Sequence, residues 1–244
     1  MTHVPRLSAS TMLVTLGVLS VGCGTPPGQP RAGSITSAPN DIVEFDALYP
    51  NNCAGCHGAN GRGGAAIALD NPVYLAIVDE RAMRATTAGG VRGTSMPAFA
   101  QRAGGMLTDR QIDAIVDGIR SRWSRPGVLD GAPPPSYRPA AAGDVRRGAT
   151  AYRTFCESCH GPDGRGGPKG SAITNDSFLA LTSDQGLRTM VIAGRPELGA
   201  PDWRSYLDGR PMSDQEVTDV VSWLASHRVP TPGQPYATAR TDQP

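Results

Sequence analysis

Apolar residues recur at helical spacing in segments that come in pairs, 103 to 105 positions apart along the chain. The pairs are 41–52 with 144–155, 71–78 with 175–181, and 80–87 with 184–193. The last pair of helices is predicted to open with the capping boxes Thr108-x-x-Gln111 and Ser213-x-x-Glu216. The pattern predicts an all-α fold in which the last helix of each half buries one apolar stripe, formed by Ile112, Ile115, Val116 and Ile119 and by Val217, Val220, Val221 and Leu224.

The pairing extends to the residues between the helices, so the chain carries a duplicated domain. "HGANGRGG" at 57–64 matches "HGPDGRGG" at 160–167, and "MPAF" at 96–99 matches "APDW" at 200–203. The Pro-rich stretch between the repeats cannot continue a helix and holds the two domains as semi-rigid neighbours. We expect domains at 41–123 and 144–229, a linker at 124–143 and a flexible C-terminal tail at 230–244.

Composition narrows the class of partner. The 244 residues are enough for two small domains, and 23 basic against 22 acidic side chains leave a net charge of +1. This balance does not favour a nucleic-acid partner.

The amino terminus predicts export. Arg6 precedes the apolar run "TMLVTLGVLSVG", which is too short to span a bilayer and is typical of a signal peptide, here 1–22. Gly22-Cys23 resembles the lipobox of bacterial lipoproteins, although Leu19 lies one place further from the cysteine than usual. The alternative is an ordinary cleaved signal with an incidental cysteine. We expect a protein at the periplasmic or outer face of a membrane, anchored by lipid at Cys23 through a flexible tether at 23–40.

The other four cysteines form two C-x-x-C-H motifs, the attachment motif for c-type haem: Cys53-Ala-Gly-Cys56-His57 and Cys156-Glu-Ser-Cys159-His160. Two thiols one helical turn apart add to the two vinyl groups of the porphyrin, and the adjacent histidine offers a nitrogen to the iron. A zinc knuckle or a redox disulfide is the alternative, and the duplicated frame behind an export signal weighs against both. The glycines of "GRGG" are expected to let the backbone pass close beside the porphyrin.

With these motifs the chain resembles the di-haem class I c-type cytochromes, which are two cytochrome c folds in tandem, over residues 41–122 and 144–228. The resemblance implies two covalently attached haem c groups, each wrapped by a few short helices. It also implies a sixth iron ligand from a methionine about forty residues after the histidine. Met96 follows His57 by 39 positions and precedes a proline. We therefore expect His57 and Met96 to bind the first iron, and His160 to bind the second.

The second repeat has Ala200 at the position of Met96, so its sixth ligand stays open. Ligation by another side chain is one hypothesis, with Met212 the favoured candidate and Met190 and His227 behind it. Each has a competing interpretation, the two methionines as core residues and His227 as an exposed residue past the last helix. An open five-coordinate iron is a second hypothesis, and a ligand from a partner protein is a third.

We expect an electron carrier, not an enzyme, that passes single electrons between periplasmic or membrane redox partners. The resemblance implies that a membrane oxidase or a quinol-oxidising complex is among them. One alternative is a haem enzyme or small-ligand sensor, such as a peroxidase, that uses an open second haem; only Asp202 and Arg204 offer an acid or base there. A second is a fixed electron-transfer subunit of a larger respiratory complex.

Overall fold

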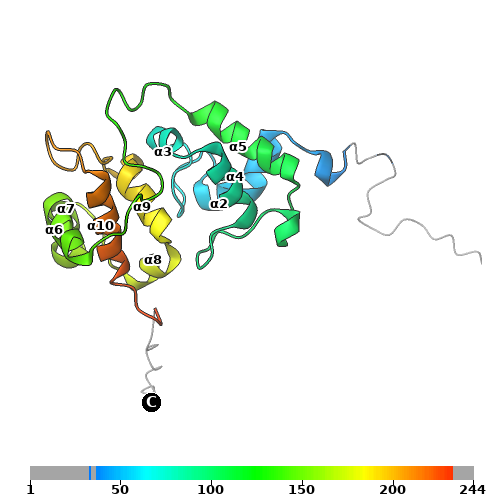
Figure 1. Ribbon diagram of the computed structural model, residues 1–244. Coiled ribbons are helices and arrows are strands. Elements are labelled where there is room, and N and C mark those ends of the chain that lie inside the picture. The colour runs from blue at the N-terminus through cyan, green and yellow to red at the C-terminus, as the bar shows by residue number, and fades with distance from the viewer. Residues whose placement is uncertain (1–32, 34–36, 233–244) are drawn as a thin grey trace, which may run out of the picture. The chain divides into compact units, whose positions relative to one another are not determined.

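Short helices joined by loops make up both halves of the chain (Figure 1). The computed structural model describes residue 33 and residues 37–232. Within these residues there is no β-strand, which confirms the all-α prediction; isolated bridges pair Ala100 with Leu107 and Arg195 with Ala200. The α-helices are α1 (Phe45–Asn52), α2 (Ala54–His57), α3 (Pro72–Ile77), α4 (Glu80–Gly89), α5 (Asp109–Trp123), α6 (Val145–Phe155), α7 (Glu157–His160), α8 (Asp176–Leu181), α9 (Asp184–Ala193) and α10 (Asp214–Ala225). Single 3-10 turns cover Pro39–Asp41, Gln101–Ala103, Pro162–Gly164 and Pro196–Leu198.

Several sequence predictions concern residues that the structure does not describe. The signal peptide at 1–22, Cys23, most of the tether and residues 233–244 of the tail lie outside the described part of the chain. Of the described residues, 39–232 belong to one compact unit that contains both repeats. Among the residues described, no helix is both long and apolar enough to cross a bilayer.

The helix starts follow from their capping residues. Both predicted capping boxes are present, so the side chains of Thr108 and Ser213 accept from the backbone N–H groups of Gln111 and Glu216. Asn71 and Asn175, predicted as the first residues of two helices, are the N-cap residues of these helices. Both side chains accept from N–H groups in the first turn of the helix that follows. Most predicted helices therefore agree with the structure to within one or two residues.

The first helix is the exception, because it begins at Phe45 and not at Asp41. The side-chain amide of Gln111, on α5, donates to the carbonyls of Pro39 at 2.9 Å and Ile42 at 3.0 Å. The segment before α1 is thereby held against α5, and Glu44 is the N-cap residue, with extended backbone and no side-chain bond to the helix. A partner some seventy residues away therefore sets this boundary.

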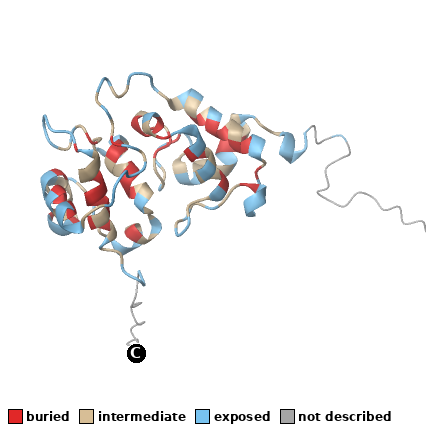
Figure 2. Ribbon diagram, in the orientation of Figure 1, coloured by how far each residue is buried: buried red, intermediate tan, exposed pale blue. Residues whose placement is uncertain are grey.

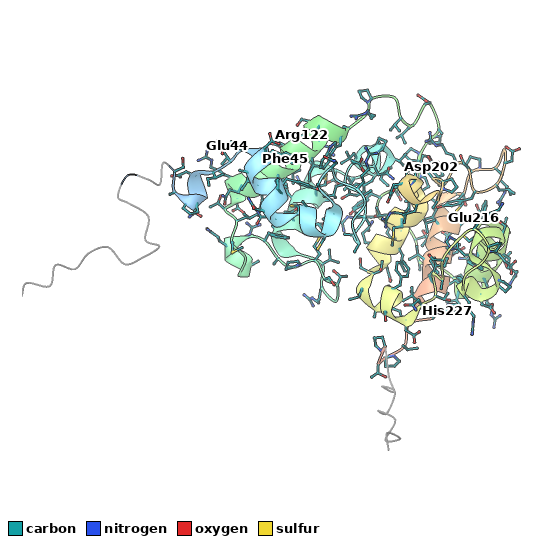
Figure 3. The ribbon with its side chains drawn as sticks, turned by 180° about the vertical axis from the view of Figure 1, so that it is seen from behind. Glu44, Phe45, Arg122, Asp202, Glu216 and His227 are labelled. Carbon is teal, nitrogen blue, oxygen red and sulfur yellow. The ribbon has the colours of Figure 1, made fainter. Side chains whose placement is uncertain are left out.

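In each repeat the first and last helices pack against each other, and the predicted apolar stripes are buried there (Figure 2). Aromatic rings fill the crossing in the first repeat, where Tyr49 lies 5.1 Å from Phe45 and 5.2 Å from Trp123, between ring centroids. Arg122 covers the outer face of Phe45 at 4.5 Å, and the two side chains lie together in Figure 3. In the second repeat Tyr152 stacks on Trp223 at 4.1 Å.

The linker is bound along the second repeat. Arg188 on α9, which is 2% exposed, donates to the Ser136 carbonyl at 2.8 Å and to the Asp214 carboxylate at 2.6 Å. The side chain of Gln185 donates to the Tyr137 carbonyl at 2.8 Å. Hydrogen bonds that use a buried arginine are costly to break, so the linker is held to the α9 and α10 surface.

The crossing of α6 with α10 carries a pH-dependent ion pair between Arg147 and Asp219. The Asp219 side chain is 3% exposed and accepts from Arg147 Nε at 2.7 Å, from Gln215 Nε2 at 2.9 Å and from the Asp144 backbone N–H at 2.8 Å. Burial raises the pKa of this carboxyl, but the hydrogen bonds together outweigh burial and hold the pKa below its ordinary value.

We expect Asp219→Asn to lower the free energy of unfolding by about 2 kcal/mol at pH 7. The folded-state pKa is below the unfolded value of about 3.9, so the stabilisation is present above that pH and disappears as the pH falls through the folded pKa. Denaturant unfolding of both proteins from pH 7 to pH 3 measures this difference. A difference that stays constant or grows as the pH falls would contradict the expectation.

Candidate functional site

Each C-x-x-C-H motif ends in a short helix that is followed by a loop whose backbone orients the histidine. His57, at the end of α2, bonds through Nδ1 to the Ile67 carbonyl at 2.8 Å, and His160, at the end of α7, bonds to the Ser171 carbonyl at the same distance. A carbonyl only accepts, so Nδ1 carries the hydrogen and Nε2 keeps a lone pair for a metal. Burial lowers the pKa of His57 although its bond to Ile67 opposes the shift, which favours the neutral imidazole. Both motifs fit a haem iron.

The cysteines of the two motifs are free thiols. Burial, with a smaller contribution from the neighbouring cysteine, raises the pKa of Cys53 to about 11 and that of Cys156 to about 12. A redox-active C-x-x-C motif has a lowered thiol pKa, so these values disfavour the redox-disulfide alternative. No three His, Cys, Asp or Glu side chains gather into a metal-binding group in the described part of the chain, and a zinc knuckle would need such a group.

The Gly-rich loops pass close to the motif helices themselves. A Cβ on Gly64 would lie 2.0 Å from the Cys56 carbonyl oxygen, and one on Gly167 would lie 2.4 Å from the Cys159 carbonyl oxygen. These glycines are therefore required by a backbone-to-backbone contact, a reason that differs from the close approach to the porphyrin expected from sequence. The contact keeps the loop close to the helix whose histidine it orients.

The loops that carry Met96 and Ala200 share one backbone hydrogen bond, which is accepted by the carbonyl of each of these residues. The Val91 N–H donates to the Met96 carbonyl at 3.0 Å, and the Arg195 N–H donates to the Ala200 carbonyl at 3.0 Å. Each follows a helix that ends in a glycine of positive φ, 68° at Gly90 and 67° at Gly194. Ala200 therefore lies at the backbone position of Met96, although the Ala200 N–H donates to the Arg195 carbonyl at 3.0 Å and the Met96 N–H donates to the Thr94 hydroxyl at 3.2 Å.

The three candidate sixth ligands of the second site each have a place in the packing of the protein. Met212 is 2% exposed and its N–H donates to the Trp203 carbonyl at 2.9 Å, just as Leu107 donates to Phe99 in the first repeat. Met190 lines a small cavity against the first repeat. His227, labelled in Figure 3, donates through Nδ1 to the Trp223 carbonyl at 2.8 Å and packs its ring on that indole. The burial of Met212 and its equivalence to Leu107 support the interpretation of Met212 as a core residue.

The side chains that sequence offers as distal acid or base are bound to each other. Arg204 donates to the Asp202 carboxylate at 2.7 Å and to the Val128 carbonyl of the linker at 2.9 Å, and it lies over the Trp203 ring. Asp202 is labelled in Figure 3. The Asp202 carboxylate is therefore engaged in an ion pair with Arg204.

Sequence reasoning missed other residues around the two motifs. The Tyr49 hydroxyl donates to the Gly58 carbonyl at 2.9 Å and the Tyr152 hydroxyl to the Gly161 carbonyl at 2.5 Å, which ties the first helix of each repeat to the loop after the histidine. The repeat of both tyrosines four positions before a cysteine was the available signal. The Tyr206 hydroxyl donates to the Val191 carbonyl, and burial, with a smaller contribution from the nearby Cys156, raises the pKa of Tyr206. The first repeat has no tyrosine at the matching position, so the sequence repeat did not point to Tyr206.

Known proteins match both halves of the chain. The family described as cytochrome c matches residues 145–228, and the family described as cytochrome c oxidase, cbb3-type, subunit III, matches residues 40–117. The subunit CcoP of the cbb3-type cytochrome c oxidase from Azospirillum is 33% identical over 131 residues, which cover 49% of this chain and 39% of the relative. The cytochrome c subunit of the Mycobacterium bovis cytochrome bc1 complex is 24% identical over 72% of this chain and 60% of the relative.

The chain therefore matches less than two thirds of the length of these relatives. Among solved structures, a reducing HAO-like protein complex of Kuenenia stuttgartiensis aligns with 79% of this chain and 100% of that chain, at 19% identity and a TM-score of 0.45. The family matches cover both C-x-x-C-H motifs. The helical fold, the two motifs and these matches together support a c-type cytochrome.

Proposed function

We propose that this cytochrome carries two haem c groups and passes single electrons between redox partners at a membrane. The observation that carries the proposal is the duplicated geometry, in which a C-x-x-C-H helix and a backbone carbonyl together present one imidazole for an iron in each repeat. Haem c supplies a one-electron couple when bound. The chain would attach the porphyrins, fix the two imidazoles and set the potential of each iron through its sixth ligand.

The two sites would be unequal. Met96 supplies a thioether at the first, and this ligand raises the reduction potential of a haem. Ala200 has no atom that binds iron, and Met212, Met190 and His227 each have other contacts. We therefore propose a five-coordinate or water-ligated second iron. Unequal potentials favour electron flow from the second site toward the first.

The relatives suggest the class of partner. One belongs by name to an oxidase and the other to a bc1 complex, so we propose a membrane oxidase or a quinol-oxidising complex as a partner of this chain. Lipid attachment at Cys23, after the apolar run, would keep the cytochrome near such a complex. A peroxidase-like function is less well supported, because Asp202 and Arg204 pair with each other.

The number of haems and the binding of carbon monoxide, both measured on the purified mature protein, test the proposal. We expect about two covalent haems per chain by mass and by pyridine haemochrome, since each motif holds one. We expect about one carbon monoxide bound per reduced chain, and one high-spin ferric signal, since one iron lacks a sixth protein ligand. Fewer than two haems would overturn the di-haem proposal, and two low-spin signals without carbon monoxide binding would overturn the open second site.

A further inference from the structure

The two repeats touch through α3 of the first and α9 of the second, which lie near each other in Figure 1. A small cavity between them is lined from both sides, by Ile67, Ala68 and Asn71 and by Met190, Gly194 and Arg195 among others. Ile67 provides the carbonyl that orients His57, and Arg195 pairs with Ala200. The contact therefore lies between two loops of different function. One is the loop that orients His57 in the first repeat, and the other is the loop that carries Ala200 in the second.

One buried side chain joins these two loops. Asn71 is 4% exposed, and its Oδ1 accepts from the N–H groups of Val73 at 2.9 Å and Tyr74 at 3.1 Å, which caps α3. Its Nδ2 donates to the carbonyl of Ala193, at the end of α9, at 2.9 Å. Capping uses only the oxygen of the amide, so the nitrogen is available for the bond to the second repeat.

The other repeat provides an internal comparison. Asn175 caps α8 in the same way, with Oδ1 accepting from Ser177 and Phe178 at 3.1 Å each, but its side chain is exposed to solvent. The duplicated position thus has the same local role in both repeats. The bond to Ala193 is an addition specific to Asn71.

The hydrogen bond of Asn71 completes a short connection between the two sites. It begins at His57, continues through the Ile67 carbonyl and four residues of backbone to Asn71, and crosses to Ala193. From there the chain runs directly to Gly194 and Arg195, whose backbone bonds to Ala200 in both directions at 3.0 Å. A shift of this contact would change the separation of the two haem sites.

We propose that Asn71 is a positioning residue for electron exchange between the two haems, because its bond to Ala193 fixes one repeat against the other. In this exchange one iron goes from ferrous to ferric while the other goes from ferric to ferrous, and no bond or proton is transferred. Electron tunnelling falls exponentially with distance, so a looser contact slows the exchange. The inference rests on the proposed presence of two haems.

The test uses Asn71→Ser in the full two-haem protein, with Asn175→Ser as the matched control. Serine caps a helix about as well as asparagine, so both variants keep the starts of their helices. The serine hydroxyl is too short to reach Ala193, so only Asn71→Ser loses the contact between repeats. We expect exchange after flash reduction of one haem to slow by about fivefold or more in this variant alone. We also expect faster amide hydrogen exchange at Arg195 and Ala200.

The midpoint potentials of both haems are measured in each variant, so that a change in driving force is separated from a change in distance. Equal rates and equal amide exchange in Asn71→Ser and the wild type would overturn the role of Asn71. Equal slowing in both serine variants would overturn it as well. A wild-type protein with fewer than two haems would instead overturn the proposed function.

Discussion

Replacing Ala200 with methionine is expected to close the second haem site to carbon monoxide. The backbone at Ala200 shares two features with that at Met96, a 3.0 Å bond to its carbonyl and a glycine of positive φ before the loop. A proline follows both positions. A methionine side chain at 200 should therefore start from the position from which Met96 starts, and its sulfur should reach the iron of its own repeat.

Binding of carbon monoxide to the reduced protein measures the result. We expect the stoichiometry to fall from about one per chain to near zero in Ala200→Met, and the potential of the second haem to rise because thioether ligation favours the ferrous iron. Met96→Ala is the reciprocal control and should raise the stoichiometry to about two. If Ala200→Met still binds carbon monoxide as the wild type does, another side chain or a displaced loop controls the second site.

The fold was largely predictable because its signals are local. A capping box places the start of a helix within four residues, and the buried stripes of α5 and α10 follow from their own periodicity. The predicted start of α1 was wrong because Gln111, far along the chain, donates to the carbonyls of Pro39 and Ile42, which precede this helix. No pattern within residues 41–52 carries that information.

The candidate sites also contain residues that a local motif predicts and contacts that only the packing determines. The thiols and imidazoles lie within five consecutive residues, so the motif alone predicts them. The carbonyls that orient the imidazoles belong to Ile67 and Ser171, and any residue supplies a carbonyl, so sequence gives no signal for them. The bond from Asn71 to Ala193 spans more than a hundred residues between repeats that are otherwise alike. Only the packing of the repeats reveals it.

The close crossing of α6 and α10 makes Gly148 the position where one added methyl group should cost most stability. A Cβ there would lie 2.1 Å from the Asp219 carbonyl oxygen and 2.7 Å from the Trp223 Cβ. The first of these atoms is helix backbone and cannot rotate away, so the two helices must separate. Gly148→Ala should therefore lower the free energy of unfolding of the second repeat by about 3 kcal/mol.

Gly89→Ala is the matched control, because this exposed glycine also lies in a helix and a Cβ there meets nothing within 4 Å. It should leave stability unchanged or raise it by about 0.5 kcal/mol, since alanine restricts the unfolded chain. Denaturant unfolding of both variants makes the comparison. Since α6 leads directly into Cys156, Gly148→Ala should also reduce haem attachment at the second motif, while the first motif keeps its haem. Equal stability of the two variants would mean that α6 and α10 do not pack as closely as the structure has them.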